Sequence, residues 1–345
     1  MAICANGEAM VTLRKIAEAC GVSLATVSKA LNDASDLSKA TKERIQKAAK
    51  EMGYLPNVAA KALRTSRSFS FGIIYEEAAK YGLTHEFFSR ILNSFMRQAQ
   101  TLGYDVFFVG DQLGGKHISY AEHARYRNSD GILIIAGTDR VADVVSDVRQ
   151  YECPVTCIDF EFDGISSVVS DNTRGMHDLV DYIHSQGHRK IAFIYGDDTH
   201  VTRARVRAFK AACQGHGIEV PPDYLISAFY HDPEATQKAT RRLLQLPDPP
   251  TCVLLPDDIS YLGALNEFRA HHFGIPQDIS VAGYDGISVV QYVHPQLTTL
   301  RQDAEEMGSQ AAEMLARQAE AGHPYTPEHI SVAGHLIPGE TVRPI

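Results

Sequence analysis

Residues 11–32 read VTLRKIAEACGVSLATVSKALN and contain two short helical patterns on either side of Gly21. Ser23 stands where its hydroxyl can cap the second helix near Thr26. The outward side chains of that helix are polar or small, so it can enter a DNA major groove. The apolar residues recur at the spacing of two crossing inner helix faces: Ile16, Ala17, Cys20, Val22, Val27 and Leu31. The stretch predicts a helix-turn-helix, although any three-helix bundle shares this periodicity.

The next segment extends this pattern. Ser38 is expected to cap a helix over residues 39–52, with Gly53 ending it. Its apolar face includes Ile45, Ala48, Ala49 and Met52. Residues 53–65 then read GYLPNVAAKALRT.

Several motifs together carry a resemblance to a known family. They are VTLRKIA, GVSLATVSKALN and GYLPNVAAKAL near the start, and GHRKIAFI, ISVAGYDG and QLTTLRQD downstream. The chain resembles the lactose/galactose repressor (LacI/GalR) family from residue 11 to about residue 343. The resemblance implies a small all-α helix-turn-helix head followed by an α/β body. The body would have two doubly wound parallel-sheet lobes of the periplasmic-binding-protein type.

Composition and charge agree with this organisation. The 345 residues are 44% hydrophobic, and the chain has neither a signal peptide nor an apolar run of about 18 residues. We therefore expect a soluble, cytoplasmic protein without membrane contact. Residues 1–67 carry 11 Lys and Arg against 6 Asp and Glu, a net charge of +5, whereas the remainder carries 22 against 36, a net charge of −14. Only the first segment is suited to contact phosphates.

The sequence gives little support to an enzyme. The pairs Asp197-Asp198 and Asp257-Asp258 are adjacent in the chain, so their carboxylates diverge, and no HxxEH, GxSxG or P-loop spacing occurs. The six cysteines show no CxxC or zinc spacing and are interpreted as reduced thiols. A disulfide between Cys153 and Cys157 is the less favoured alternative. We expect no catalysis, no metal and no cofactor.

From residue 68 onward, short apolar runs alternate with helical patterns, which is typical of doubly wound parallel sheets. The expected strands are residues 69–75, 105–110, 131–135, 155–159, 191–195, 252–255 and 280–283. The expected helices are residues 87–102, 178–186, 204–215 and 261–271. We divide the chain into a disordered tail (1–10), a helix-turn-helix domain (11–55), a hinge helix and linker (56–67) and an effector-binding domain (68–345). The resemblance implies three crossings between the lobes, giving a first lobe of about 68–169 and 303–330 and a second of about 170–298 and 331–345.

Candidate effector contacts stand at strand ends, where ligands bind in such sheets. Asp159, Asp257, Asp258 and Asp285 follow predicted strands, and Arg205 lies at the start of a predicted helix. Carboxylates and a guanidinium can together hold vicinal hydroxyls, although an Asp at a strand end can equally cap the next helix. The resemblance implies that Phe87, Asp159, Arg205, Tyr230, Asp257 and Asp285 contact the effector. Phe88 is expected in the core.

The Asp257-Asp258 pair departs from the Asn-Asp that is common in the family. The added negative charge disfavours an anionic ligand, so we expect a neutral sugar or polyol rather than a sugar phosphate.

The resemblance also implies the DNA contacts. Leu24, Ala25 and Lys29 would reach bases, with Lys29 standing where Arg is common and lacking its planar fork. Residues 57–63 would form a hinge helix with Leu63 as a minor-groove wedge. The complete predicted DNA-binding set is Thr12, Ser23, Leu24, Ala25, Ser28, Lys29, Asn32, Ser38, Thr41, Asn57, Ala60 and Leu63.

The sequence thus predicts an allosteric transcription repressor of carbohydrate-utilisation genes. Its partners would be double-stranded palindromic operator DNA, a small-molecule effector of the sugar class and a second copy of the chain in a homodimer. One alternative is a sugar-binding protein whose head contacts a protein partner. Another is a corepressor-type regulator that binds a nucleoside or purine.

Overall fold

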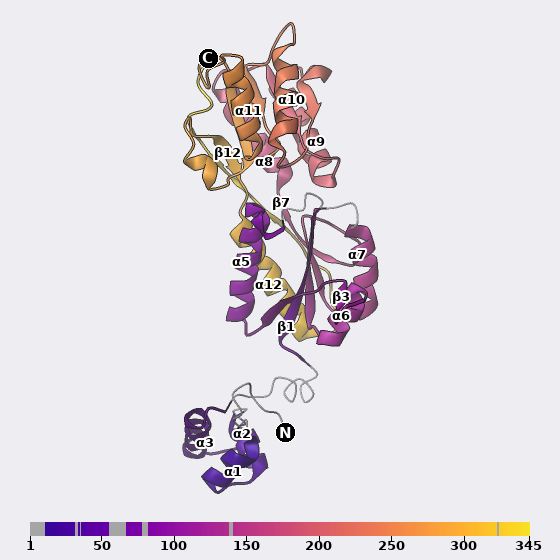
Figure 1. Cartoon of the computed structure of the whole chain (residues 1–345), viewed down its shortest axis with the longest axis vertical. Coiled ribbons are helices and arrows are strands. Elements are labelled where there is room, and N and C mark those ends of the chain that lie inside the picture. Colours follow the sequence, from indigo (N-terminus) through magenta and orange to yellow (C-terminus); the bar gives the residue numbers. More distant parts are fainter. Residues whose placement is uncertain are drawn as a thin grey trace. The chain divides into compact units, whose positions relative to one another are not determined.

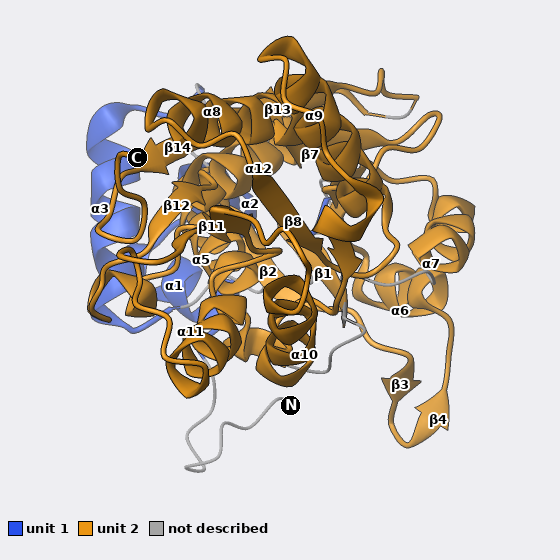
Figure 2. Ribbon diagram, turned by 90° about the horizontal axis from the view of Figure 1, so that it is seen from above, with its two compact units in different colours: residues 1–68 blue, residues 69–345 orange. Residues whose placement is uncertain are grey.

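The computed structural model describes residues 11–31, 34, 36–54, 67–77, 82–137, 141–322 and 324–345. They form two compact units, residues 1–68 and 69–345, termed the head and the body (Figure 2). The predicted tail (1–10) and residues 56–66 of the predicted hinge and linker lie outside the described residues. In the described part of the chain, no helix is long and apolar enough to cross a membrane.

The head contains three described helices, α1 (Leu13–Cys20), α2 (Leu24–Leu31) and α3 (Lys39–Glu51). Gly21 ends α1 with a φ of 62°, a left-handed conformation in which Gly carries no steric penalty. Ser23 and Ser38 accept hydrogen bonds from the amides of Thr26 and Thr41, as predicted. One apolar core joins the three helices and is formed by Ile16, Ala17, Cys20, Val27, Ala30, Ile45 and Ala49.

The first lobe of the body contains a parallel six-stranded sheet with the order β13-β7-β6-β5-β1-β2. Figure 1 labels two of its strands, β1 and β7. Its strands are β1 (Ser70–Glu77), β2 (Asp105–Phe108), β5 (Gly131–Gly137), β6 (Val155–Ile158), β7 (Ser166–Ser170) and β13 (His329–Val332). Helices α5 (Glu86–Thr101) and α12 (Ala304–Ala321) share one core with the sheet. Helices α6 (Tyr120–Arg127) and α7 (Val141–Val148) share the other. Alternate strand residues enter the two cores, because successive side chains point to opposite faces.

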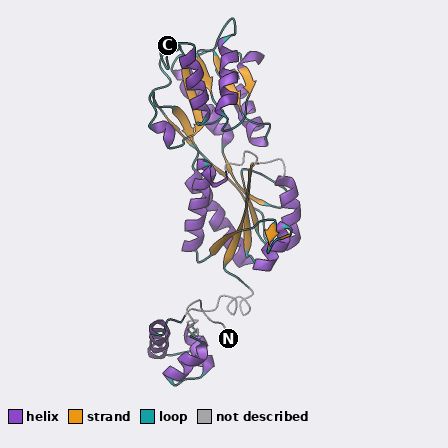
Figure 3. Cartoon of the chain, in the orientation of Figure 1, coloured by secondary structure: helices purple, strands orange, loops and turns teal. Residues whose placement is uncertain are grey.

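The second lobe repeats this plan with the order β14-β12-β11-β10-β8-β9. Figure 3 shows strands flanked by helices in both lobes. Its strands are β8 (Ile191–Tyr195), β9 (Leu225–Ser227), β10 (Cys252–Leu254), β11 (Ser280–Asp285), β12 (Thr298–Arg301) and β14 (His335–Ile337), and only β14 is antiparallel to its neighbour. Helices α8 (Asn172–Ser185) and α9 (His200–Gly215) cover one face. Helices α10 (Pro233–Leu244) and α11 (Ser260–Ala270) cover the other. The predicted fold class, a helix-turn-helix head with two parallel α/β lobes, is confirmed.

The chain passes between the lobes after β7, after β12 and after β13. The strands define where these crossings begin, because β12 keeps residues 298–301 in the second sheet and β13 keeps residues 329–332 in the first, within three residues of the expected limits. Helix α8 also begins at Asn172 rather than residue 178, because the Asp171 side chain caps it by accepting from the Arg174 amide at 2.9 Å.

An ion-pair cluster around the buried Glu267 side chain joins α10 to α11. The Glu267 side chain is 1% exposed and accepts from Arg241 Nε at 2.6 Å, and His271 Nε2 lies 2.9 Å from the same oxygen. The hydrogen bond from Arg241 lowers the pKa of Glu267 to about 2. The ionised form of Glu267 is therefore favoured by folding.

We predict that Glu267→Gln lowers the free energy of unfolding by about 2 kcal/mol near neutral pH, because it removes charge-assisted hydrogen bonds from a buried group. The stabilisation should be complete above pH 4.5 and disappear as the pH falls through about 2, since the folded-state pKa is depressed. The matched control is Glu328→Gln. The Glu328 and Arg317 side chains are 41% and 49% exposed, so their ion pair is expected to contribute less than about 1 kcal/mol to the free energy of unfolding. Equal losses in urea unfolding of the two variants would contradict this prediction.

Candidate functional site

The exposed face of α2 is the candidate DNA-reading surface of the head. Leu24 is 51% exposed, and Ala25 and Lys29 are also exposed, whereas Val27 and Ala30 are buried against the other helices. The core therefore holds α2 by one face and leaves the predicted base-reading residues outward. Ser28 is half-buried at the edge of this face.

The predicted phosphate-binding hydroxyls lie at helix starts. Thr12 Oγ1 accepts from the Lys15 amide at 3.4 Å, and Ser23 and Ser38 accept at 3.1 and 3.3 Å from Thr26 and Thr41. Helix N-termini attract anions because their first amides and the helix dipole are positive. The remaining members of the predicted set, Asn32, Asn57, Ala60 and Leu63, lie outside the described residues.

Lys29 is engaged within the head. Its Nζ lies 2.5 Å from Asp36 Oδ2, and the two side chains are 52% and 55% exposed. The sequence prediction named Lys29 but not Asp36, because six residues separate them in the chain.

Arg205 is the centre of the candidate effector site in the body. It lies on α9, is 4% exposed, and donates from Nε to Asn172 Oδ1 at 2.7 Å and from Nη1 to the Pro256 carbonyl at 3.3 Å. Its guanidinium carbon stands 3.7 Å from the centre of the Tyr284 ring. Gly175 on α8 makes room for that ring, because a Cβ there would lie 2.5 Å from the Tyr284 hydroxyl. The described contacts use two of the five N–H donors of Arg205, so the rest can serve a ligand.

Asp285 and Asp159 bring carboxylates from both lobes towards this guanidinium. Asp285 ends β11 and accepts from Gln302 Nε2 at 2.7 Å, whereas Asp159 follows β6 of the first lobe and accepts from the Ser170 amide at 2.9 Å. Burial raises the pKa of Asp285 to about 6 and also raises the pKa of Asp159, and in both cases the charge of Arg205 opposes the shift. Both have positive φ values, 105° and 58°. Such backbone conformations are costly for residues other than Gly and cluster at functional sites.

Tyr230 also joins this group. Its hydroxyl lies 2.8 Å from Thr202 Oγ1 on α9, and its amide donates to Asp197 Oδ2 at 3.3 Å. The charges of Arg205 and Asp285 both act on its phenol. The structure thus places Tyr230, Arg205, Asp285 and Asp159 together; we call these four residues the interlobe cluster.

The Asp257 carboxylate is engaged in hydrogen bonds within the second lobe. Its Oδ1 accepts from the Ser260 amide at 2.9 Å, and its Oδ2 accepts from the His231 amide at 2.8 Å and from the Ser260 hydroxyl at 3.2 Å. Its carboxylate therefore accepts from the first amide of α11 and holds the residue after Tyr230. This matches the alternative that we set beside the effector role for an Asp at a strand end.

Asp258, the neighbour of Asp257, lies inside the second lobe. Asp258 is fully buried and accepts from Thr299 Oγ1 at 2.7 Å and from the Ile287 amide at 2.9 Å. Burial raises its pKa well above the usual range. The departure from Asn-Asp lies at Asp257, so the added negative charge expected there stays a prediction.

Phe87 and Phe88 lie at different depths of the first-lobe core, against which Phe88 packs as expected. Phe87 is 4% exposed and packs in the core formed with α5 and α12. Phe88 is half-buried, and its ring centre lies 4.5 Å from that of His85. His85 in turn lies 4.1 Å from His231 of the second lobe. Because an α-helix turns about 100° per residue, adjacent residues face different directions, and it is Phe88 that lies near the lobe junction.

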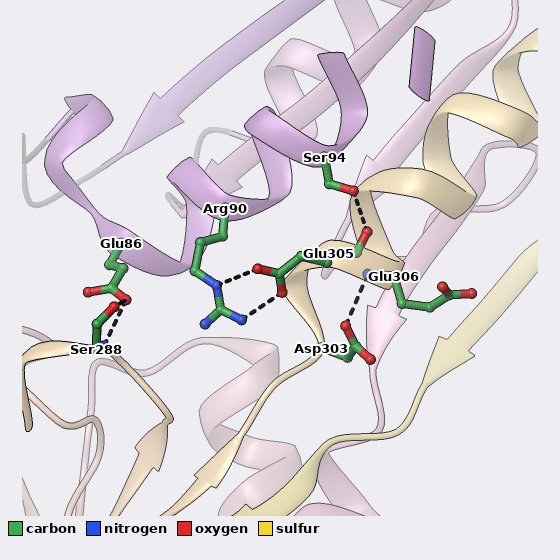
Figure 4. A network of polar contacts seen from close by, with 7 residues as sticks. All are labelled: Glu86, Arg90, Ser94, Ser288, Asp303, Glu305 and Glu306. Atoms are coloured by element: carbon green, nitrogen blue, oxygen red, sulfur yellow. Dashed lines mark hydrogen bonds and ion pairs between the residues drawn. The ribbon is translucent and has the colours of Figure 1, made fainter. Parts of the chain in front are cut away.

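Two further contacts hold the lobes against each other. Glu86, in the first turn of α5, accepts from the Ser288 amide at 2.8 Å and from its hydroxyl at 2.5 Å (Figure 4). Within the first lobe, one turn later on α5, Arg90 binds both carboxylate oxygens of Glu305 at 3.0 and 2.6 Å and so connects α5 to the start of α12 (Figure 4). The rings of Phe160 and His200 lie 4.4 Å apart and connect the lobes near Asp159.

The crossing segments also carry polar links that sequence reasoning missed. Gln302 donates to Asp285 and accepts from the Ser170 hydroxyl, so it connects two of the three segments that pass between the lobes. Asn172 and Tyr284, which hold Arg205, were also missed. Asn172 and Gln302 lie next to predicted crossings, and that position was the one available signal. Among the described residues, no group of three His, Cys, Asp or Glu side chains is placed to hold a metal ion.

Comparison with known proteins connects both sites to one family. Residues 12–57 match the model of bacterial regulatory proteins of the lacI family, and residues 180–342 match that of the periplasmic binding protein-like domain. The probable HTH-type transcriptional repressor ExuR of Bacillus subtilis (strain 168) is 31% identical over 89% of this chain and 91% of its own length. The HTH-type transcriptional repressor CytR of Escherichia coli (strain K12) is 30% identical over 97% of each chain.

Solved structures share the fold. The Lac repressor dimer bound to operator and the anti-inducer ONPF has a TM-score of 0.78 at 23% identity, covering 97% of this chain and 100% of that one. The transcriptional regulator CelR in complex with cellobiose has a TM-score of 0.69 at 24% identity, covering 96% and 99%. With a helix-turn-helix whose reading helix is exposed, a two-lobed α/β body and repressor relatives along nearly its full length, this chain belongs to the lacI family of bacterial regulatory proteins and is a DNA-binding transcriptional repressor.

Proposed function

We propose that this repressor is switched by a neutral, hydroxyl-rich small molecule, of the sugar class, that binds at the interlobe cluster. The observation that carries the proposal is the buried Arg205 guanidinium, held by Asn172 and Tyr284 and flanked by Asp159 and Asp285 from different lobes. A carboxylate accepts from hydroxyls and a guanidinium donates to them, so the set can grip neighbouring hydroxyl groups. Two carboxylates against one guanidinium disfavour an anion.

The switch would act through the lobe junction. A ligand that contacts Asp159 in the first lobe and Arg205 in the second has different contacts in each relative lobe orientation, and only such a difference shifts an equilibrium. Gln302, Glu86 and Ser288 link the same two lobes beside the cluster. A change at the cluster would therefore reach all of these contacts and alter DNA affinity.

On the DNA side, the proposal is a homodimer on an approximately palindromic operator that controls carbohydrate-utilisation genes, in the cytoplasm and without catalysis. The basic head and the outward face of α2 support the DNA contact, and a twofold dimer requires a symmetric site. Leu24 and Ala25 would give apolar contacts to bases and Lys29 a polar one.

The effector proposal is tested by a thermal-shift screen over sugars, sugar phosphates, nucleosides and purines. At 100 times its dissociation constant a ligand should stabilise the protein by about 2.7 kcal/mol. Arg205→Gln should abolish the shift. Arg203→Gln should retain it, because Arg203 lies on the same helix as Arg205 but is exposed and paired with Asp198. A hit that stabilises both variants equally would refute the cluster as the binding site. If only nucleosides or purines stabilise the protein, the sugar class is wrong.

A second prediction concerns the cost of keeping Asp285 buried. Its folded-state pKa of about 6 is raised, so the stability linked to its proton is complete at low pH and is lost as the pH rises through about 6. Asp285→Asn should therefore stabilise the ligand-free protein by up to about 3 kcal/mol above pH 7, because each pKa unit corresponds to about 1.4 kcal/mol. The Gln302 donor retains an acceptor in this variant.

The same Asp285→Asn variant should lose most of its ligand-induced stabilisation, since a charged acceptor has been replaced by a neutral one. Denaturant unfolding at pH 5 and pH 8, with and without the screened ligand, measures both effects. A variant that is less stable than the wild type at pH 8, or that responds fully to the ligand, would contradict the assignment.

The DNA proposal predicts that the full-length protein enriches an approximately palindromic duplex from a random pool, with an affinity that falls as salt rises. Lys29→Ala should weaken binding to that duplex about tenfold or more, because a good base contact is worth about 1–3 kcal/mol. Lys47→Ala, which removes an exposed lysine paired with Glu51, is the control and should change affinity for selected and scrambled duplexes alike. Absence of any enriched duplex would overturn the operator proposal.

A further inference from the structure

The ion pair between Lys29 and Asp36 lies on the DNA-reading side of the head. Lys29 is in the last turn of α2, and Asp36 comes two residues before Ser38, the cap of α3. Their Nζ and Oδ2 atoms are 2.5 Å apart, and each side chain is about half exposed. Lys29 thus belongs to the exposed face of α2 while its ammonium group is held by a carboxylate from the next segment.

The pair is not required to hold the head together. Exposed ion pairs contribute about 0–1 kcal/mol to stability, whereas the buried core that includes Ile16, Val27 and Ile45 joins all three helices. A carboxylate near a DNA-binding surface also repels phosphates and reduces affinity. The position of Asp36 therefore calls for a role in binding rather than in folding.

The chemistry of lysine supplies that role. A lysine ammonium is a point charge on a flexible stem with three donors, whereas arginine presents a rigid planar fork. When Asp36 accepts from one N–H, the direction of the ammonium is restricted and two donors remain for acceptors such as guanine O6 and N7. The hydrogen bond from Lys29 lowers the pKa of Asp36, so the carboxylate stays ionised at neutral pH.

The same contact changes how Lys29 meets the DNA backbone. A lysine without a partner can swing to any nearby phosphate and adds sequence-independent affinity, whereas a lysine beside a carboxylate is largely neutralised at longer range. A paired ammonium group therefore binds mainly those acceptors that its two remaining N–H donors can reach. Restricting Lys29 would therefore lower affinity for all sequences while preserving it for the correct one.

We propose that Asp36 is a positioning residue that sets DNA specificity by directing the Lys29 ammonium to a base and withholding it from phosphates. The inference rests on the sequence-specific DNA binding proposed above. It assigns specificity to a residue outside α2 whose own side chain need not contact any base.

The test compares Asp36→Asn with the matched control Glu51→Gln in the full-length protein. Both changes remove one exposed carboxylate from the head and release a lysine, Lys29 or Lys47, but only the first alters the face of α2. Binding is measured by fluorescence anisotropy over a salt series, on the duplex that the wild type selects from a random pool and on a scrambled duplex of equal length.

For Asp36→Asn we expect tighter binding to the scrambled duplex, a salt slope steeper by about 0.9 for one added phosphate contact, and a specificity ratio about tenfold lower. Asp36→Glu, which retains the carboxylate, should recover most of the ratio. Glu51→Gln should shift both duplexes equally and leave the ratio unchanged. Thermal unfolding of each variant establishes that the head is folded.

Two results would overturn the proposal. One is a ratio for Asp36→Asn that matches that of Glu51→Gln. The other is an unchanged effect of Asp36→Asn when Lys29 is already Ala, because a residue that acts through Lys29 must lose its effect in that background. A wild type that does not discriminate between the duplexes would instead show that the operator proposal itself is wrong and would overturn this inference with it.

Discussion

The body is organised around one buried charge, the Arg205 guanidinium. A charge that is 4% exposed must be compensated by hydrogen bonds and opposite charges, because an unpaired buried ion is strongly destabilising. The compensation comes from Asn172 on α8, from the Tyr284 face and Asp285 on β11, and from Asp159 across the lobe junction. Since these elements belong to two sheets, stabilising a single side chain constrains both lobes.

The head is basic and the body is acidic. The head combines a net positive charge with exposed helix starts and an exposed α2 face, which suits phosphates and bases. The acidic body buries a few of its carboxylates, and burial raises the pKa of Asp159, Asp258 and Asp285. Carboxylates held in this way destabilise the fold when ionised, and proteins commonly accept such a cost at functional sites. Polar crossing residues such as Gln302 then join the buried carboxylates to the segments that any lobe movement must bend.

Sequence patterns were most informative where the interactions are local. Gly21, Ser23 and Ser38 act within three or four residues of themselves, so the head was predicted almost as it is. The strand β7, SSVVS, was missed because its serines resemble a loop, yet Ser166 is buried and accepts from Gln318 far along the chain. Phe87 was expected at the effector and Phe88 in the core, and Phe87 is the more buried of the two, because neighbouring aromatic residues look alike until the helix is placed against its core.

The sequence by itself determined the family, the three helices of the head and the alternation of strands and helices in the body, and it named the four members of the interlobe cluster among six expected effector contacts. Only the tertiary structure decided that Asn172 and Tyr284 hold Arg205, that Asp257 accepts from the first amide of α11, that Asp258 is fully buried, and that Asp36 holds Lys29. The physical reason is the separation along the chain of the residues that interact. Helix caps, turns and periodicity depend on neighbours in the chain, whereas burial and the satisfaction of a charge depend on residues that only folding brings together.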